Sequence, residues 1–119
     1  NNVQLDDIVS LAFEINLDGL VISNTTIGRL HLKTGADIIA RTGAGGLSGK
    51  PLMQLSTEVL QYISKQTAGK IPLIASGGIF TGEDAAKKAA AGASLVQVWT
   101  GFIYEGPSIV KNICKALDQ

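Results

Sequence analysis

The sequence predicts an α/β fold with a parallel sheet, and three observations support that prediction. Short apolar runs at residues 20–23, 71–75 and 95–99 alternate with segments of helical periodicity. Apolar runs with hardly a polar break are typical of parallel strands. Each run ends in polar or glycine-rich residues. Strands that alternate with helices favour a parallel sheet with right-handed crossovers, so we expect the three ends to meet at one edge.

Four longer segments are predicted to be helices. They are residues 1–16, 56–69, 83–91 and a last helix that starts at Gly106-Pro107. Apolar residues recur in them at the three- and four-residue spacing of a helix face. Ser56 is the predicted N-cap of the second helix, because serine favours that position.

The composition limits the classes of partner. The 119 residues allow one domain at most, and ten acidic residues balance ten basic ones. That balance gives no electrostatic argument for nucleic acid or an anionic membrane surface. No apolar run is long enough to span a membrane, so we expect this segment itself to be soluble. Cys114, the single cysteine, is predicted to be a core residue of the last helix.

The central stretch, residues 71–79, reads as a buried strand that ends in Gly77 and Gly78. Two residues without Cβ let a ligand approach the backbone and offer N–H groups to an anion. Residues 81–84 then form a capping-box pattern that opens a helix. Strand, glycine turn and helix start is a layout that holds phosphate in α/β proteins. A tight turn without a ligand is the alternative interpretation.

Two other stretches carry candidate ligand contacts. Residues 23–26 place small polar side chains after the first strand, at the end where a parallel α/β fold binds its ligand. The alternative interpretation is the start of a polar loop, with these side chains making turn hydrogen bonds. The long connection, residues 27–50, predicts a functional lid or a disordered segment. Within it Ser48 and Gly49 could donate hydrogen bonds, and Lys50 either meets an anion or is solvated. His31, the only histidine, reads as a loop residue.

Four motifs together resemble the dihydroorotate dehydrogenases, and more closely their class 2, quinone-reducing branch. The motifs are DGLVISNTT at 18–26, GGLSGKPL at 45–52, IPLIASGG at 71–78 and AGASLVQVWTG at 91–101. The resemblance covers essentially the whole chain, which corresponds to about the last third of the family's catalytic domain. It therefore implies that residues 1–119 are a single partial domain, the C-terminal portion of a TIM (β/α)8 barrel with about three strand–helix units.

The resemblance also implies an activity and a set of site residues. The family oxidises dihydroorotate to orotate with FMN and, in class 2, a quinone acceptor, in de novo pyrimidine biosynthesis. The implied orotate contacts are Asn24 and Thr25. The implied FMN contacts are Ser23, Ser48 and Gly49, a first phosphate loop of Ser76, Gly77 and Gly78, and a second of Val98, Trp99 and Thr100. Two departures are Trp99, where the family pattern has tyrosine, and a loop at 41–46 that is longer by a residue or two.

The resemblance assigns no catalytic base to this chain. It implies a serine base on an earlier loop, and an N-terminal segment that holds the parent enzyme peripherally on a bacterial or mitochondrial inner membrane. This segment alone should be inactive. Three strands of an eight-stranded barrel leave open edges and exposed apolar surface. We therefore expect the chain to pair with the remainder of the barrel, or with itself.

Two other interpretations of function stay open on the residues alone. One is a phosphate-binding partial barrel that acts as a binding or assembly module without redox activity. The other is a different flavin or phosphate barrel, such as a lyase, although the Asn24-Thr25-Thr26 run and the glycine-rich loop at 45–49 disfavour it.

Overall fold

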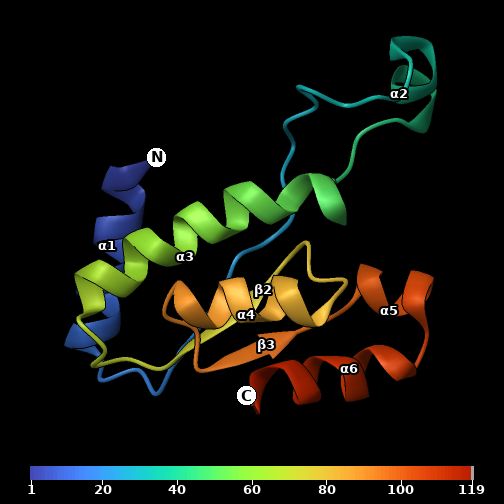
Figure 1. The fold of residues 1–119 in the computed structure, drawn as a ribbon. Helices are drawn as coiled ribbons and strands as arrows, with labels where there is room; N and C mark the ends of the chain where they lie inside the picture. The colour runs from blue at the N-terminus through green and yellow to red at the C-terminus, as the bar shows by residue number, and fades with distance from the viewer. Residues whose placement is uncertain (119) are drawn as a thin grey trace.

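The structure is a computed structural model that describes residues 1–118, and it has the predicted α/β arrangement (Figure 1). In chain order its elements are α1 (Asn2–Glu14), β1 (Leu20–Ile22), α2 (Ala36–Thr42), the 3-10 turn η1 (Lys50–Leu52), α3 (Met53–Thr67), β2 (Leu73–Ser76), α4 (Gly82–Ala90), β3 (Leu95–Gln97), α5 (Thr100–Glu105) and α6 (Ser108–Leu117).

The three strands form one sheet in the order β1-β2-β3, and both strand pairs are parallel. The prediction of a parallel sheet is confirmed. In the register, Val21 lies level with Ile74, and Ile74 lies level with Leu95. Parallel pairing brings the carboxyl ends of all three strands to the same edge, which is where the polar and glycine-rich segments follow.

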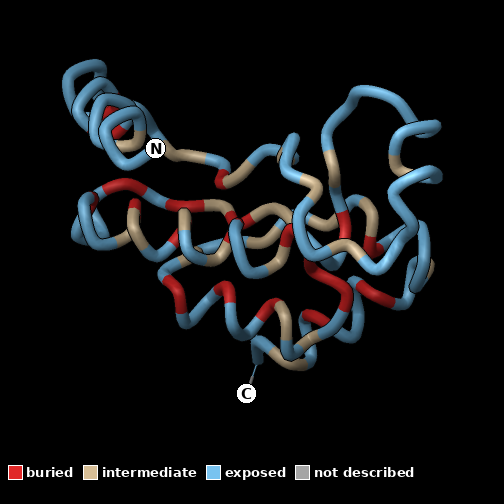
Figure 2. The backbone as a smooth tube through the Cα atoms, turned by 90° about the horizontal axis from the view of Figure 1, so that it is seen from above, coloured by how far each residue is buried: buried red, intermediate tan, exposed pale blue. Residues whose placement is uncertain are grey.

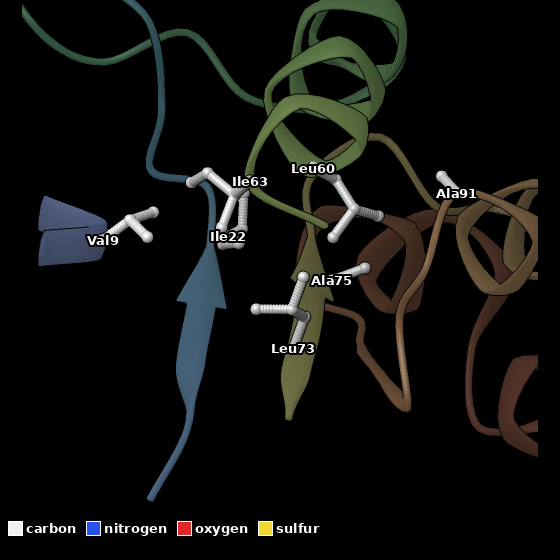
Figure 3. Close-up of a cluster of buried hydrophobic side chains, with 7 residues drawn as sticks. All are labelled: Val9, Ile22, Leu60, Ile63, Leu73, Ala75 and Ala91. Atoms are coloured by element: carbon white, nitrogen blue, oxygen red, sulfur yellow. The ribbon is translucent and has the colours of Figure 1, made fainter. Parts of the chain in front are cut away.

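Helices cover one face of this sheet. Figure 3 shows side chains of α1 and α3 meeting those of β1 and β2 in one cluster. The cluster consists of Val9, Ile22, Leu60, Ile63, Leu73, Ala75 and Ala91. A second cluster packs α4 against α6 through Ile79, Ala85, Ile109 and Ile113. Burial of this apolar surface holds the strand ends in place.

The opposite face of the sheet is open in the described part of the chain. Its middle row consists of Val21, which is 54% exposed, the half-buried Ile74, and Leu95, which is 63% exposed. These exposed side chains agree with the expectation that three strands of a barrel leave apolar surface uncovered. Every helix that packs on the sheet does so on the other side, where Ile22, Leu73 and Ala75 point.

The start of α3 differs from the prediction. Ser56 is not an N-cap, because the helix begins at Met53, directly after η1. Ser56 lies one turn inside the helix and is fully buried. In contrast, the predicted capping box of α4 is confirmed: Thr81 Oγ1 accepts a hydrogen bond from the N–H of Asp84, and the Asp84 carboxylate accepts one from the N–H of Thr81.

The C-terminal region contains one helix that the sequence did not predict and one wrong burial prediction. β3 ends at Gln97, and the short helix α5 precedes Gly106. In α6, Ile109 and Ile113 are buried against α4, whereas Cys114 is exposed. The prediction of Cys114 as a core residue is wrong, because α4 covers only part of the broad apolar face of α6.

The long connection between β1 and α3 carries α2 away from the sheet (Figure 1), and no residue of α2 is buried. Figure 2 shows exposed backbone along most of this connection. Leu47, near its end, forms an isolated antiparallel bridge with Thr26, which lies just before its start. None of the helices among residues 1–118 is both long enough and apolar enough to cross a lipid bilayer.

Candidate functional site

A hollow of about 140 Å³ lies at the carboxyl ends of the three strands. Every site residue predicted from the sequence lines it: Ser23, Asn24, Thr25, Ser48, Gly49, Ser76, Gly77, Gly78, Val98, Trp99 and Thr100. The structure therefore brings together residues from four separate segments. Four further residues line the hollow and were not predicted: Leu52, Ile79, Gln97 and Gly101. Ile79, Gln97 and Gly101 each adjoin a predicted residue, and Leu52 ends the motif at 45–52.

The turn after β2 presents free backbone N–H groups. Gly77 and Gly78 have φ angles of +104° and +78°, which favour glycine. Within residues 1–118, no hydrogen bond uses the N–H of Gly77, Gly78 or Ile79 as its donor. Gly78 and Ile79 are nevertheless buried. Buried N–H groups are almost always paired, so this turn is suited to accept an anion or ordered water.

Gly78 is needed here for a reason that the sequence does not reveal. A Cβ on Gly78 would lie 2.4 Å from Met53 Cα and 2.6 Å from Met53 N. It would therefore collide with the first residue of α3, and Met53 is not among the lining residues. A side chain at this position would reduce the space for a ligand at the turn. It would also displace α3 from the turn.

The carbonyl side of the same turn is braced by α3 and α4. Ser56 Oγ donates to the carbonyl of Gly77 at 3.0 Å, and Lys88 Nζ donates to Ser56 Oγ at 2.6 Å. Lys88 is fully buried. Burial lowers the pKa of Lys88 to about 8, while the nearby Asp84 carboxylate acts in the opposite direction. Sequence reasoning missed Lys88 and misplaced Ser56, because nothing local distinguishes Lys88 from its exposed neighbour Lys87.

The segment after β1 reaches the hollow with a polar edge. The N–H of Ser23 donates to the carbonyl of Ser76 at 3.2 Å, which extends the β1–β2 pairing into the site. Asn24 Oδ1 accepts the N–H of Thr25 at 2.7 Å. With its oxygen held by its own loop, the exposed Asn24 side chain has its NH₂ group available as a donor toward a ligand.

The end of the long connection supplies further lining residues of the hollow, Ser48 and Gly49. Thr100 Oγ1 donates to Ser48 Oγ at 2.9 Å, which joins the connection to the start of α5. Gly49 follows with a φ of +80°. Lys50 Nζ lies over the Phe80 ring, 5.3 Å from its centroid, and Lys50 does not line the hollow. Trp99 is 83% exposed at the rim, so it is not a core residue.

Comparison with known proteins gives a consistent result. The family model described as Dihydroorotate dehydrogenase matches residues 1–119. The chain is 51% identical over 121 residues to Dihydroorotate dehydrogenase (quinone) of Nostoc punctiforme, covering 97% of this chain and 32% of that protein. It is 49% identical over 114 residues to Dihydroorotate dehydrogenase (quinone), mitochondrial, of Arabidopsis thaliana, covering 96% of this chain and 24% of that protein.

Solved structures agree with these relatives. A crystal structure of DHODH from Eimeria tenella in complex with ferulenol superposes with a TM-score of 0.88 at 42% identity. That match covers 98% of this chain and 30% of the solved chain. The ligand-free form from the same organism gives the same TM-score at 41% identity. The predicted fold, part of a TIM (β/α)8 barrel, is confirmed by these matches, and the chain spans about a third of the relatives' length or less.

Proposed function

Because this chain belongs to the dihydroorotate dehydrogenase family, we propose that it forms part of a flavoenzyme that oxidises dihydroorotate to orotate with FMN and a quinone acceptor. The reaction belongs to de novo pyrimidine biosynthesis. The names of the relatives, which carry the word quinone, support the choice of acceptor. The chain's own contribution is the strand-end hollow and the residues around it.

The observation that supports FMN most directly is the turn at residues 77–79, where the N–H groups are free and Gly78 and Ile79 are buried. A phosphate monoester carries the oxygens and negative charge that such a turn accepts. Ser76, Gly77 and Gly78 would hold the phosphate from β2, and Val98, Trp99 and Thr100 would approach it from β3. Ser23, Ser48 and Gly49 would contact the flavin. When bound, FMN supplies a two-electron acceptor for the oxidation of dihydroorotate.

Asn24 and Thr25 are the proposed substrate contacts. Both lie on the exposed segment that follows β1 and line the same hollow as the phosphate turn. The amide of Asn24 is oriented by its bond to the Thr25 N–H, which leaves the NH₂ group to donate to a ring carbonyl of orotate. A side chain that is already oriented loses less conformational freedom when the ligand binds.

The remaining parts of the reaction are assigned to residues outside this chain. The catalytic base, the closing strands of the barrel and the quinone-facing membrane segment belong to the rest of the enzyme. We expect the parent enzyme to lie peripherally on a bacterial or mitochondrial inner membrane. The open row of Val21, Ile74 and Leu95 supports the requirement for the rest of the barrel, because an exposed apolar face of this kind packs against other side chains.

The experiment that tests this function uses the purified full-length protein. We expect a flavin absorbance spectrum and release of FMN on denaturation. We also expect dihydroorotate-dependent reduction of a dye in the presence of added quinone. Protein that binds inorganic phosphate but holds no flavin and shows no such reduction would contradict the proposal. That result would instead favour a phosphate-binding module without redox activity.

Asn24→Ala should weaken orotate binding while FMN stays bound. The substitution removes a positioned donor and leaves a ring carbonyl unpaired, which costs about 1–3 kcal/mol. Titration of the oxidised holoenzyme with orotate, followed by the flavin spectrum, measures the change. Asn112→Ala, at an exposed position of α6, is the matched control and should leave the affinity unchanged. Equal orotate affinity in Asn24→Ala and wild type would refute the assignment.

A further inference from the structure

Lys88 is a buried lysine for which the proposed function has no role so far. It is the largest fully buried side chain in the described part of the chain. Buried lysines are rare unless they are paired. Among residues 1–118, the only salt bridge joins Lys87 to Glu83, so no carboxylate forms a direct ion pair with Lys88. A buried cation without an ion partner is costly to keep, which makes the position informative.

The ammonium group of Lys88 is tied to the glycine turn through one serine. The Lys88 ammonium can donate hydrogen bonds but cannot accept them. It donates to Ser56 Oγ at 2.6 Å and to the Met53 carbonyl at 3.4 Å. That carbonyl also accepts Thr57 Oγ1 at 2.7 Å. Ser56 Oγ has one proton and two carbonyl acceptors within reach, that of Gly77 at 3.0 Å and that of Met53 at 3.1 Å. Because the Met53 carbonyl already accepts Thr57 Oγ1, we assign the Ser56 proton to the carbonyl of Gly77.

This contact determines the direction of a peptide group that lines the hollow. In a planar trans peptide the carbonyl and the following N–H point in opposite directions. With the Gly77 carbonyl held toward Ser56 on α3, the N–H of Gly78 points away from α3. Peptides between two glycines rotate easily, because neither residue has a Cβ to restrict it. The bond from Ser56 therefore selects one of the orientations that Gly77 and Gly78 allow.

We propose that Lys88 is a positioning residue for the phosphate group of the cofactor: through Ser56 it holds the Gly78 N–H toward the anion, and its buried positive charge stabilises that anion from behind the turn. The inference rests on the proposed function, because it requires a phosphate in the strand-end hollow. It adds a charge to a site whose lining residues carry none. In the buried interior such a charge acts more strongly than it would in water.

The test compares FMN with riboflavin, which has the same ring system and lacks the phosphate. Full-length apoprotein is titrated with each flavin, and quenching of flavin fluorescence measures both dissociation constants. Lys88→Met keeps the length of the side chain and removes its charge. We expect it to reduce the preference for FMN over riboflavin by about tenfold or more, with riboflavin affinity unchanged. Ser56→Ala, which removes one oxygen, should change the preference in the same direction.

Lys87→Met is the matched control. Lys87 is the adjacent residue on α4, but its side chain is 57% exposed and pairs with Glu83. This variant should keep the wild-type preference. A wild-type preference in both Lys88→Met and Ser56→Ala would overturn the inference, and so would an equal loss of both flavins, which indicates a purely structural role. Wild-type protein with no preference for FMN would instead remove the proposed phosphate site itself.

Discussion

Gly78→Ala is expected to destabilise the protein by about 3 kcal/mol or more and to abolish FMN retention. Two costs add at this position. A φ of +78° is strained for any residue with a Cβ, and that Cβ would lie within 2.6 Å of the backbone N, the Cα and the Cβ of Met53. Because backbone cannot give way as a side chain can, α3 must move away from the turn. Urea unfolding and the flavin content of the purified full-length protein measure both effects.

Gly69→Ala is the matched control for the backbone strain alone. Gly69 has nearly the same φ, +73°, but a Cβ there would meet no atom within 4 Å. The expected cost is about 1–2 kcal/mol, with FMN retained. Equal unfolding midpoints for the two variants would show that the contact with Met53 does not matter. A stable Gly78→Ala protein with full flavin content would remove the assignment of this turn to the cofactor.

The second large effect concerns pH. The pKa of Lys88 is lowered from 10.5 to about 8 in the folded protein, chiefly by burial. Between these two values the unfolded chain binds more protons at this lysine than the folded one, so stability rises with pH. From pH 7 to pH 11 this lysine should add up to about 3 kcal/mol to the free energy of unfolding. Asp84 is the charged group that partly offsets the burial.

Because other groups also titrate over this range, the measurement is a difference between two proteins. Unfolding free energies of wild type and Lys88→Met are compared at each pH from 7 to 11. The free energy of unfolding of the wild type, relative to that of the variant, should increase as the pH rises through about 8 and should level off near 10.5. A difference that stays constant with pH would mean that Lys88 keeps an ordinary pKa and is solvated. Lys87→Met should keep the rise with pH through about 8, because Lys87 is exposed and its pairing with Glu83 raises its own pKa.

Several features could be read from short stretches of sequence because they depend on local chemistry. The capping box at Thr81 and Asp84 forms as predicted, because both partners lie within one helical turn. The strands end where polar or glycine residues begin, and parallel pairing then gathers those ends around one hollow. The predicted site residues therefore lie together around this hollow, and their assignment as cofactor and substrate contacts stays a prediction.

Other features could not be predicted from the sequence because they depend on contacts between distant segments. Ser56 reads as a cap, since serine before an apolar helical face is typical of one, yet η1 starts the helix earlier and buries this serine. Cys114 belongs to an apolar face that α4 covers only in part. The short helix α5 follows an apolar run so closely that periodicity could not separate it from the end of β3.

The sequence by itself determined the α/β class, the parallel strands and the residues that gather at their carboxyl ends, because apolar periodicity and glycine placement act over a few neighbouring residues. Only the tertiary structure decided why Gly78 must be glycine and which lysine is buried behind it. Both answers depend on how α3 and α4 pack against the turn after β2, with Met53 lying 2.4 Å from a Cβ on Gly78 and Lys88 bonded to Ser56 across two helices. Packing between segments far apart in the chain leaves no local pattern from which it could be read.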